Sequence, residues 1–394
     1  MSPANTRKKN NQLLVNKLYQ ELCLIENDLD YYIQIFIDNL LLIEEEEFYE
    51  FKNLIVDSMQ SCKQEAFNEA DVIVTTLTGS SNMFIRNIKD KISLLIVDEA
   101  SQATELTTLI PLTYDIPKAI LIGDSKQLPP TVIHNDAKNN NYGRSLFERL
   151  QYNSPESVHL LDIQYRMHPM ISTLSSKCFY ENAIVNGENV KSKKWQKSWF
   201  KNPDFGPLVF YNVKGIINKD DSSLTNMKEA NEVLNIIKNL LNAKPSLSIN
   251  TSISVISPYR AQVFLIRKKL KLLHKDNLDR FSKYQKEIQE NQEAIQLTDE
   301  GKELLKKINI LENINVNTVD SFQGQESDIV ILSCVRSGTR SLGFLTDKRR
   351  LNVSITRARF SLIIFGDSQT LSKDKYWKRI IDDIKKVNCF KTVS

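Results

Sequence analysis

Cysteine is scarce in this sequence, and its few copies follow no structural pattern. There are five cysteines among 394 residues, and no two of them form a CxxC pair. This argues against a disulfide framework and a zinc site, and it fits a reducing compartment. The first ten residues, MSPANTRKKN, have no apolar core behind their basic residues, so the sequence predicts no secretory signal. The most apolar early run, Ile33–Ile43, is short and contains Asp38, which argues against a membrane span.

A strong excess of one charge is also lacking. Lys and Arg number 52 and Asp and Glu number 48, which gives a formal net charge of +4. From Arg340 to the end, however, there are 13 basic and 5 acidic residues, and such a basic segment suits a polyanionic partner. With 41% hydrophobic residues, the chain is long enough to form two domains with substantial cores.

Proline is absent from residues 11–69, where apolar and charged positions alternate. We interpret this segment as two or three helices that pack without chemistry of their own. From Ala70 onward short strands alternate with helices, which predicts an α/β fold with parallel sheets. The predicted parts are a stalk-like segment 1–69, a first domain 70–150, and a second domain 151–394 with an exposed helical insertion around 275–313.

The predicted strands are short apolar runs. Ligands bind at the carboxyl ends of strands in open α/β sheets, so the polar loops that follow these runs are the candidate sites. The runs are Val72–Thr76, Leu94–Val97, Ala119–Ile122, Val158–Leu161, Leu208–Val213, Ile253–Ile256, Val316–Val319, Ile329–Cys334 and Leu362–Gly366, with predicted helices at Lys228–Leu241 and Gln262–Leu273.

Two adjacent carboxylates, Asp98 and Glu99, follow the strand Leu94–Val97, whose composition predicts burial on both faces. Mg²⁺ prefers carboxylate oxygen and keeps most of its waters, so one acid can hold the metal while its neighbour activates a water. This is the Walker B arrangement. The alternative is a strand that simply ends in a solvated acidic turn, which fits most occurrences of so short a pattern.

Two further loops combine groups suited to a nucleotide. GDSKQLPPT supplies the carboxylate of Asp124 and the neutral amide of Gln127, which can reach a phosphate or an attacking water. QYRMHP joins the stacking face of Tyr165 to the planar cation of Arg166, which suits a base and its phosphates. Packing of this Tyr-Arg pair against a neighbouring loop is the alternative.

The remaining polar segments lie in the second domain. Lys191–Lys201 places Trp195 and Trp199 among lysines, which indicates either a nucleic-acid contact or a half-buried loop. In LNVSITRAR, which we place on the last helix, Arg357 and Arg359 are two residues apart. They therefore do not share a helix face, and only one can easily reach a common target.

Six segments together carry a resemblance to a known family. DEASQATE, GDSKQLPP, QYRMHP, SPYRAQ, TVDSFQGQE and LNVSITRAR, in this order, resemble motifs II to VI of superfamily 1 helicases, in the branch of senataxin and the up-frameshift RNA helicases. The resemblance covers about residues 70–370. It implies two RecA-like parallel-sheet domains, the first one incomplete, with an N-terminal helical stalk. It also implies ATP bound between the domains and 5′ to 3′ movement on single-stranded nucleic acid.

The resemblance also assigns a role to each matching residue. Asp98 would hold Mg²⁺, Glu99 would activate the water, Gln127 would sense the γ-phosphate, Tyr165 would contact the base, Glu326 would contact the nucleotide from the second domain, and Arg166 and Arg357 would be arginine fingers. Thr76, Thr78, Pro258, Tyr259 and Thr318 would line the nucleic-acid track.

The cofactors implied by the resemblance are ATP and Mg²⁺, and the implied substrate is single-stranded RNA. RNA-processing or transcription-termination proteins are the implied partners, with no membrane association and a nuclear rather than cytoplasmic location. Two alternatives stay open. One is a DNA or dual-specificity helicase, since nothing in these residues reports on a 2′ hydroxyl. The other is a catalytically inactive module that binds nucleic acid.

One motif of the family is missing from these residues. A GxxxxGK[ST] loop holds the β- and γ-phosphates through its amides and lysine, and its hydroxyl ligates Mg²⁺. Of the 11 glycines only Gly338 and Gly343 have this spacing, and Phe344 follows them instead of lysine. We therefore expect the chain to be the C-terminal portion of a larger helicase that is inactive by itself.

Overall fold

The computed structural model describes residues 45–220, 223–243, 247–290 and 298–393. Contacts divide the chain into two compact units. The first unit comprises Met1–Val97 and Leu106–Ile120, and the second comprises Asp98–Glu105 and Leu121–Ser394. The run Ile33–Ile43 and most of the predicted stalk-like segment lie outside the described residues. No helix among the described residues is both long and apolar enough to cross a bilayer.

The first unit is built on helix α3 and a two-stranded sheet. In this unit Phe67 and Phe84 stack on one another, with ring centroids 5.7 Å apart. The Tyr114 hydroxyl donates to the Ser80 carbonyl at 2.6 Å. The elements are α3 (Glu45–Glu69), α4 (Met83–Asn87), β1 (Leu95–Val97), α5 (Glu105–Leu112) and β2 (Ala119–Leu121). The first residue of α5 and the last residue of β2 belong to the second unit.

Two predictions for this unit are wrong. Residues 72–76 form no strand, and the side chains of Val72 and Val74 are 78% and 93% exposed. Strand β1 was expected to be buried on both faces, but Ile96 is 55% exposed. The reason is that β2 is the sole strand that pairs with β1 among the described residues. An apolar run is buried only where other elements cover both of its faces.

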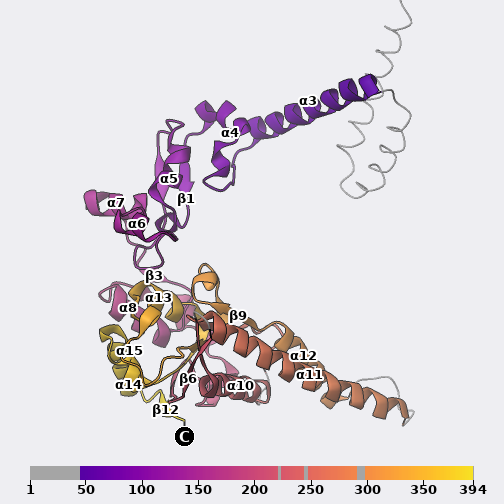
Figure 1. Cartoon of the computed structure of the whole chain (residues 1–394), viewed down its shortest axis with the longest axis vertical. Helices are drawn as coiled ribbons and strands as arrows, with labels where there is room; N and C mark the ends of the chain where they lie inside the picture. The colour runs from indigo at the N-terminus through magenta and orange to yellow at the C-terminus, as the bar shows by residue number, and fades with distance from the viewer. Residues whose placement is uncertain (1–44, 221–222, 244–246, 291–297, 394) are drawn as a thin grey trace, which may run out of the picture. The chain divides into compact units, whose positions relative to one another are not determined.

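The second unit contains a six-stranded parallel sheet, as the α/β prediction requires (Figure 1). The strand order is β12-β5-β11-β10-β8-β9, so β9 and β12 are the edges. Five of the predicted strands, from Leu208–Val213 to Leu362–Gly366, correspond to five of these six. The strands are β5 (Leu208–Asn212), β8 (Ile253–Ser257), β9 (Asn315–Thr318), β10 (Ser327–Ser333), β11 (Ala358–Gly366) and β12 (Phe390–Thr392).

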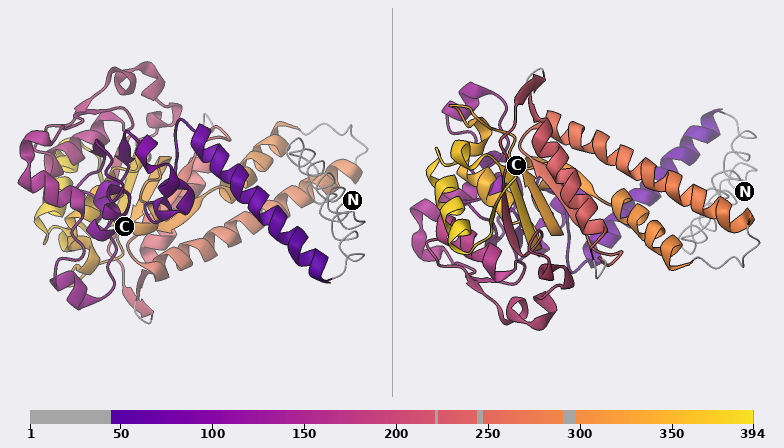
Figure 2. Two further views of the ribbon diagram at one scale, coloured as in Figure 1. Left: turned by 90° about the horizontal axis from the view of Figure 1, so that it is seen from above. Right: turned by 90° about the horizontal axis from the view of Figure 1, so that it is seen from below.

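Helices cover both faces of this sheet (Figure 2). Successive side chains of β10 point to opposite faces, so Ile331 packs in the cluster with α10, α11 and α12, while Val330 packs in the cluster with α8, α13, α14 and α15. Both side chains are fully buried, as expected for a central parallel strand. These helices are α8 (Pro169–Phe179), α10 (Met227–Leu241), α11 (Arg260–Glu290), α12 (Asp299–Glu312), α13 (Lys348–Ile355), α14 (Ser368–Leu371) and α15 (Lys375–Lys386).

The predicted strand Val158–Leu161 is wrong. These residues form no strand and pair with none of the described strands, and Leu161 is 82% exposed. The neighbouring residues Ile163–Gln164 form the short strand β3 instead, because they pair with β4 (Val185–Asn186). The smaller elements of the unit are α6 (Asn135–Asn139), α7 (Leu146–Asn153), α9 (Glu188–Lys191), β6 (Ile217–Asp220) and β7 (Ser223–Asn226).

The chain between 275 and 313 is helical where it is described, since it contains the end of α11 and all of α12. Helix α11 is much longer than the predicted Gln262–Leu273. The hydroxyls of Tyr284 and Thr298 are 2.6 Å apart, which joins the far end of α11 to the start of α12 in a hairpin. Residues 291–297 of the predicted insertion lie outside the described residues.

Candidate functional site

Arg357 is the most enclosed cation of the predicted nucleotide site. It follows α13, and its side chain is only 3% exposed. Its Nη2 donates to Oε1 of Gln127 at 2.9 Å, and its Nε donates to the Val353 carbonyl at 3.1 Å. Burial lowers the pKa of Arg357 to about 10, and the nearby cation of Arg166 acts in the same direction. The guanidinium therefore remains charged at neutral pH.

The LNVSITRAR motif does not lie wholly on one helix, and that helix is not the last. Helix α13 ends at Ile355, so Arg359 already belongs to strand β11. The Arg359 guanidinium turns to two other carboxylates, at 3.8 Å from Glu326 and 3.4 Å from Asp328. Arg357 reaches Gln127 and Arg359 does not, but the reason is that Arg359 lies on a strand, not the helix-face spacing on which the prediction relied.

Glu326 holds the other predicted arginine finger. The Nε atom of Arg166 lies 2.5 Å from Oε2 of Glu326, and both side chains are about 40% exposed. Glu326 thus lies between Arg166 and Arg359, and its carboxylate neutralises part of their charge. An anion that entered this place would compete with Glu326 for Arg166.

A hydrogen-bond network fixes the orientation of Gln127. Its Nε2 donates to Oδ2 of Asp124 at 2.9 Å, which leaves Oε1 to face Arg357. The hydroxyl of Tyr180 donates to the same Asp124 oxygen at 2.5 Å. Asn352 on α13 donates in turn to the Tyr180 hydroxyl at 2.7 Å and to the Lys126 carbonyl at 3.1 Å. Burial, together with Asp124, raises the pKa of Tyr180, so the hydroxyl stays a donor.

The sequence did not point to Tyr180 or Asn352 as parts of the site. Asn352 lies inside the LNVSITRAR segment, so the motif itself was the available signal. Tyr180 directly follows α8, and no local pattern distinguishes it from other aromatic residues at helix ends.

Asp98 and Glu99 lie in a tight turn after β1. Glu99 has a left-handed backbone conformation, with φ 50°, which is uncommon for a residue other than glycine. Its N–H donates to Oδ1 of Asp98 at 2.9 Å, and Gln102 donates to its Oε2 at 2.6 Å. Both carboxylates are exposed, and neither forms an ion pair with a described residue. Exposed carboxylate oxygens without a bound side-chain cation fit the ligand preference of Mg²⁺.

Gly123 keeps this turn close to the GDSKQ loop. A Cβ atom at Gly123 would lie 2.8 Å from the Ser101 nitrogen, so any larger residue here would require the backbone to move. The Ala100 N–H donates to the Ile122 carbonyl at 2.7 Å, and the Asp124 N–H donates to the Ser101 hydroxyl at 3.2 Å. The acidic turn and the loop that carries Gln127 are therefore joined directly, and both belong to the second unit.

Tyr165 presents its ring to solvent and is 61% exposed. The turn behind it is held by Gln164, whose Oε1 accepts from the N–H groups of Arg166 at 3.0 Å and Met167 at 2.7 Å. One edge of the ring approaches Gly187, where a Cβ atom would lie 2.5 Å from the ring. The ring is therefore placed by its surroundings and remains accessible for stacking.

The predicted nucleic-acid residues fall into two groups. Thr76 and Thr78 are exposed residues of the first unit, and their hydroxyls are 3.3 Å apart. Pro258, Tyr259 and Thr318 follow or end the adjacent strands β8 and β9, where Ser257 pairs in register with Thr318. The structure thus brings Pro258, Tyr259 and Thr318 together at the carboxyl ends of β8 and β9, which form one edge of the sheet.

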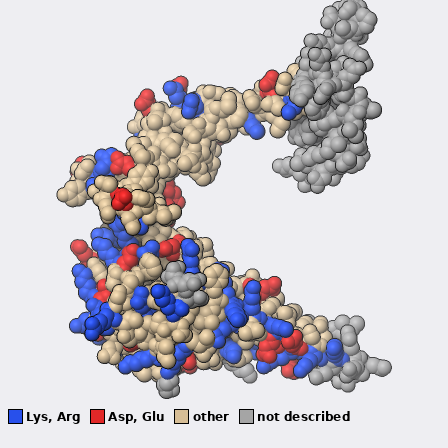
Figure 3. All heavy atoms as spheres, in the orientation of Figure 1, with Lys and Arg blue, Asp and Glu red and all other residues tan. Residues whose placement is uncertain are grey.

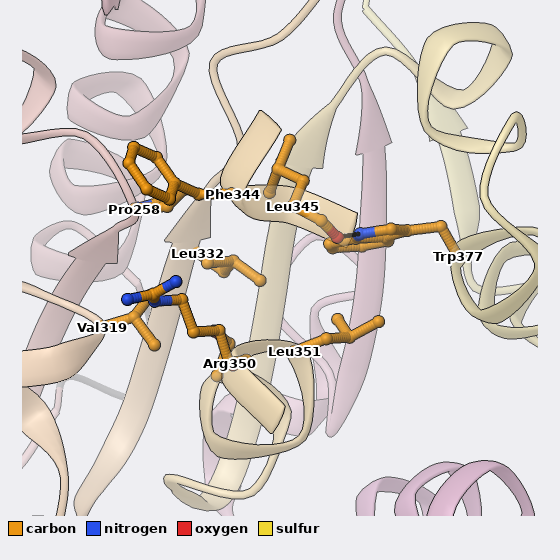
Figure 4. Close-up of a pocket in the computed structure, with 9 residues that line it drawn as sticks. Pro258, Val319, Leu332, Phe344, Leu345, Arg350, Leu351 and Trp377 are labelled. Atoms are coloured by element: carbon orange, nitrogen blue, oxygen red, sulfur yellow. Dashed lines mark hydrogen bonds between the residues drawn. The ribbon is translucent and has the colours of Figure 1, made fainter. Parts of the chain in front are cut away.

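Tyr259 is only 3% exposed, so its ring is not free to stack on a base in this structure. Its hydroxyl accepts from Nε of Arg336 at 2.8 Å, and its ring contacts Phe344. Pro258 lies nearby in a small pocket with Phe344 and Arg350, on the side of the sheet where Trp377 donates to the Leu345 carbonyl at 3.0 Å (Figure 4). Tyr259 therefore supports Arg336 at this edge.

The tryptophans of Lys191–Lys201 are part of the core. Trp199 is 7% exposed and donates through Nε1 to the Ser361 hydroxyl at 2.9 Å. Trp195 packs edge-on against Phe360, with ring centroids 5.3 Å apart. Of the two interpretations of this segment, the half-buried loop is the one that these contacts support.

A buried acid holds the loop that carries Arg336. Glu229 on α10 is fully buried, and its Oε2 accepts from the Ser333 hydroxyl at 2.5 Å and from the Val335 N–H at 2.7 Å. Val335 has a φ of 71°, a strained conformation for a β-branched residue. Burial raises the pKa of Glu229 to about 8. The carboxyl group is therefore mostly protonated in the folded state at neutral pH.

Glu229→Gln should change how stability depends on pH. Between the ordinary carboxyl pKa and about 8, the unfolded chain loses a proton that the folded chain keeps, so wild-type stability falls as the pH rises through this window. Glutamine cannot ionise, so this slope, on the order of 1 kcal/mol per pH unit, should disappear. In urea unfolding at pH 5 to 8.5, the free energy of unfolding of the variant should rise relative to that of the wild type as the pH increases. Parallel stability curves would contradict the assigned pKa.

Most of the sequence matches known protein families and relatives. Two family models, each described as an AAA domain, match residues 43–135 and 142–369, and the second match alone exceeds half of the chain. Helicase sen1 of Schizosaccharomyces pombe is 39% identical over 335 residues, which is 84% of this chain and 18% of that protein. The chain belongs to the superfamily 1 helicases, in the senataxin and up-frameshift group. The family resemblance read from the sequence is therefore confirmed.

Two further relatives come from other organisms. An uncharacterized ATP-dependent helicase of Methanocaldococcus jannaschii is 34% identical over 346 residues, or 85% of this chain and 44% of that protein. The regulator of nonsense transcripts 1 homolog of Arabidopsis thaliana is 32% identical, over 86% of this chain and 24% of that protein. The chain thus spans less than half of the length of each of these relatives. A solved structure of the PRRSV helicase gives a TM-score of 0.33 at 14% identity, covering 71% of this chain and 36% of that one, too loose a match to compare the folds.

Proposed function

We propose that this chain is part of an ATP-dependent helicase that moves 5′ to 3′ along single-stranded RNA, with ATP bound between two RecA-like domains. The observation that carries the proposal is the contact between Arg357 and Gln127, 2.9 Å apart, with Glu99 and Arg166 close enough to influence the Arg357 pKa. Residues from four separate motifs are thus within electrostatic range of Arg357 or in contact with it. Such convergence of acids, an oriented amide and arginines suits transfer of a phosphoryl group to water.

Each side chain would have a distinct task in this reaction. Asp98 would hold the metal, and Mg²⁺ bound there would neutralise charge on the phosphates. Glu99 would accept a proton from the attacking water. Gln127, oriented by Asp124, would position that water or sense the γ-phosphate. Arg357 and Arg166 would stabilise the negative charge that develops on the transferred group.

In the arrangement described here both arginines have protein partners. Arg166 is paired with Glu326 at 2.5 Å, and Arg357 is bound to Gln127. We propose that a bound triphosphate takes the place of Glu326 beside Arg166 and of Gln127 beside Arg357. Nucleotide binding would then break the contact between the second domain and the loop of Gln127, and nucleotide release would restore it. This exchange would couple hydrolysis to movement. Tyr165 would stack on the base, since its ring is accessible.

We further propose that the 394 residues by themselves hydrolyse little ATP, because they contain no GxxxxGK[ST] loop to hold the β- and γ-phosphates. RNA is proposed over DNA by likeness to the senataxin branch, and so are a nuclear location and partners in RNA processing or transcription termination. A catalytically inactive module that binds nucleic acid is the second candidate, and the missing loop is the observation that favours it.

The test is phosphate release measured with single-stranded RNA and with DNA of the same sequence. The 394 residues are compared with a longer form in which a segment containing GxxxxGK[ST] precedes residue 1. Stimulated hydrolysis is expected from the longer form alone, and more strongly with RNA. Comparable hydrolysis by the 394 residues would contradict their proposed inactivity. Failure of both forms would favour the binding module, and stronger stimulation by DNA would reassign the substrate.

A further inference from the structure

The first half of α11 carries an unusual concentration of positive charge. From Arg260 to Lys275 the helix contains six Lys or Arg residues and no Asp or Glu. Beyond this point the signs mix, and Arg280 forms an ion pair with Asp276 at 3.1 Å. Figure 3 shows basic side chains where the α11–α12 hairpin leaves the sheet, and both signs of charge toward its far end. The excess of positive over negative charge is therefore confined to the part of the helix beside the sheet.

Most of these basic residues share one exposed face of the helix. Side chains at intervals of three and four residues lie on the same side of an α-helix. The opposite face packs in the core through Val263, Ile266 and Leu270. We call the exposed set the basic stripe: Arg260, Phe264, Lys268, Lys271 and Lys275, all exposed.

Two features of the basic stripe distinguish it from an ordinary solvated surface. None of its four cations forms an ion pair with a carboxylate among the described residues. In its middle lies Phe264, whose side chain is 65% exposed, an unfavourable state for a large aromatic ring in water. Unpaired cations around an exposed ring are the combination that binds single strands, in which phosphates need cations and bases need a stacking face.

The position of the basic stripe connects it to the predicted track. Arg260 directly follows Pro258 and Tyr259. Arg267 donates to the Val316 carbonyl at 2.9 Å and to Oδ1 of Asn317 at 3.0 Å, so this part of α11 runs beside the edge strand β9, which ends at Thr318. From Arg260 to Lys275 the helix rises about 22 Å. A single-stranded nucleic acid that passes Thr318 can therefore follow the helix for several nucleotides.

We propose that the basic stripe of α11 binds single-stranded nucleic acid that continues beyond the track at the ends of β8 and β9. The inference rests on the proposed function in so far as the chain must bind nucleic acid at that edge. Long oligonucleotides would contact the track and the basic stripe together, whereas short ones would contact the track alone. The contacts are with phosphates and with one base face, so they do not select a sequence.

The test measures binding of fluorescent oligouridylates of 8 and 25 nucleotides to the 394-residue chain at several salt concentrations. For Lys268→Gln, Lys271→Gln and Lys275→Gln combined, the salt slope for the 25-mer should fall by about 2, since each phosphate contact in a single strand contributes about 0.7. Binding of the 8-mer should not change. Phe264→Ala should weaken binding of the 25-mer about tenfold through lost stacking.

A matched control removes the same charge from the far part of the hairpin. Lys283, Lys286 and Lys302 replaced by glutamine should leave binding of both oligonucleotides unchanged, and arginine at the three stripe lysines should restore binding of the 25-mer. Equal losses in the stripe and control variants would overturn the proposal, because they would report net charge alone. Equal losses for the 8-mer and the 25-mer would also overturn it.

Three other outcomes distinguish binding at the basic stripe from binding at the track and from binding of an acidic protein. If the wild type binds both oligonucleotides and the stripe variants bind them equally well, the basic stripe is excluded while the track survives. If the wild type binds neither, both are excluded. Competition by polyglutamate of the same charge, as effective as unlabelled 25-mer, would reassign the basic stripe to an acidic protein partner.

Discussion

Arg357→Ala is expected to lower the rate of ATP hydrolysis by about 10³-fold or more, the usual cost of removing an arginine finger. Arg357 is the predicted cation with the least exposure, 3%, and it contacts Gln127 directly. A buried guanidinium acts on a phosphoryl group with little screening by water. The measurement is phosphate release at saturating nucleic acid, in a form of the protein that carries a GxxxxGK[ST] segment.

Arg359 supplies the matched control for this prediction. It belongs to the same motif but is 40% exposed and pairs with Glu326 and Asp328. Arg359→Ala should therefore reduce the rate much less than Arg357→Ala. Arg357→Lys should remain strongly impaired, because an ammonium cannot replace the planar fork of donors. Unchanged nucleic-acid binding would show that the variants are folded. Equal effects at the two arginines would contradict the role given to Arg357.

Glu99→Gln is expected to reduce turnover by about 10²- to 10⁴-fold while nucleotide binding is kept, because the amide cannot accept a proton from water. Glutamine has nearly the same shape, so the left-handed turn at φ 50° and the contact with Gln102 should survive. The measurement combines phosphate release with the affinity for a fluorescent ATP analogue in the same extended form.

Asp98→Asn serves as the companion variant. If Asp98 holds the metal, its loss should weaken the dependence of nucleotide binding on Mg²⁺, which Glu99→Gln should leave intact. The Mg²⁺ dependence of nucleotide binding would then distinguish the role of Asp98 from that of Glu99. A Glu99→Gln protein that turns over ATP at the wild-type rate would remove Glu99 from its assigned role.

The strands were not all equally predictable from sequence. Strands β10 and β11 lie in the middle of a parallel sheet, so both of their faces are apolar and the run is visible in the sequence. The run at 158–161 looks similar but has no partner strand in the part of the chain that the structure describes, and its Leu161 is exposed. Strand β12 was missed, although its Phe390 stacks on Phe210, because a three-residue strand has no periodicity of its own.

The sequence by itself determined the family and the order of its motifs, because these depend on residue types at fixed separations along the chain. The tertiary structure decided which of those residues meet. It brought Arg357 to Gln127 and Arg359 to Asp328, it buried Tyr259, and it recruited Tyr180 to Asp124. It also left the basic face of α11 open. Such contacts join residues far apart in the chain, and burial is a property of the packed neighbours rather than of the residue.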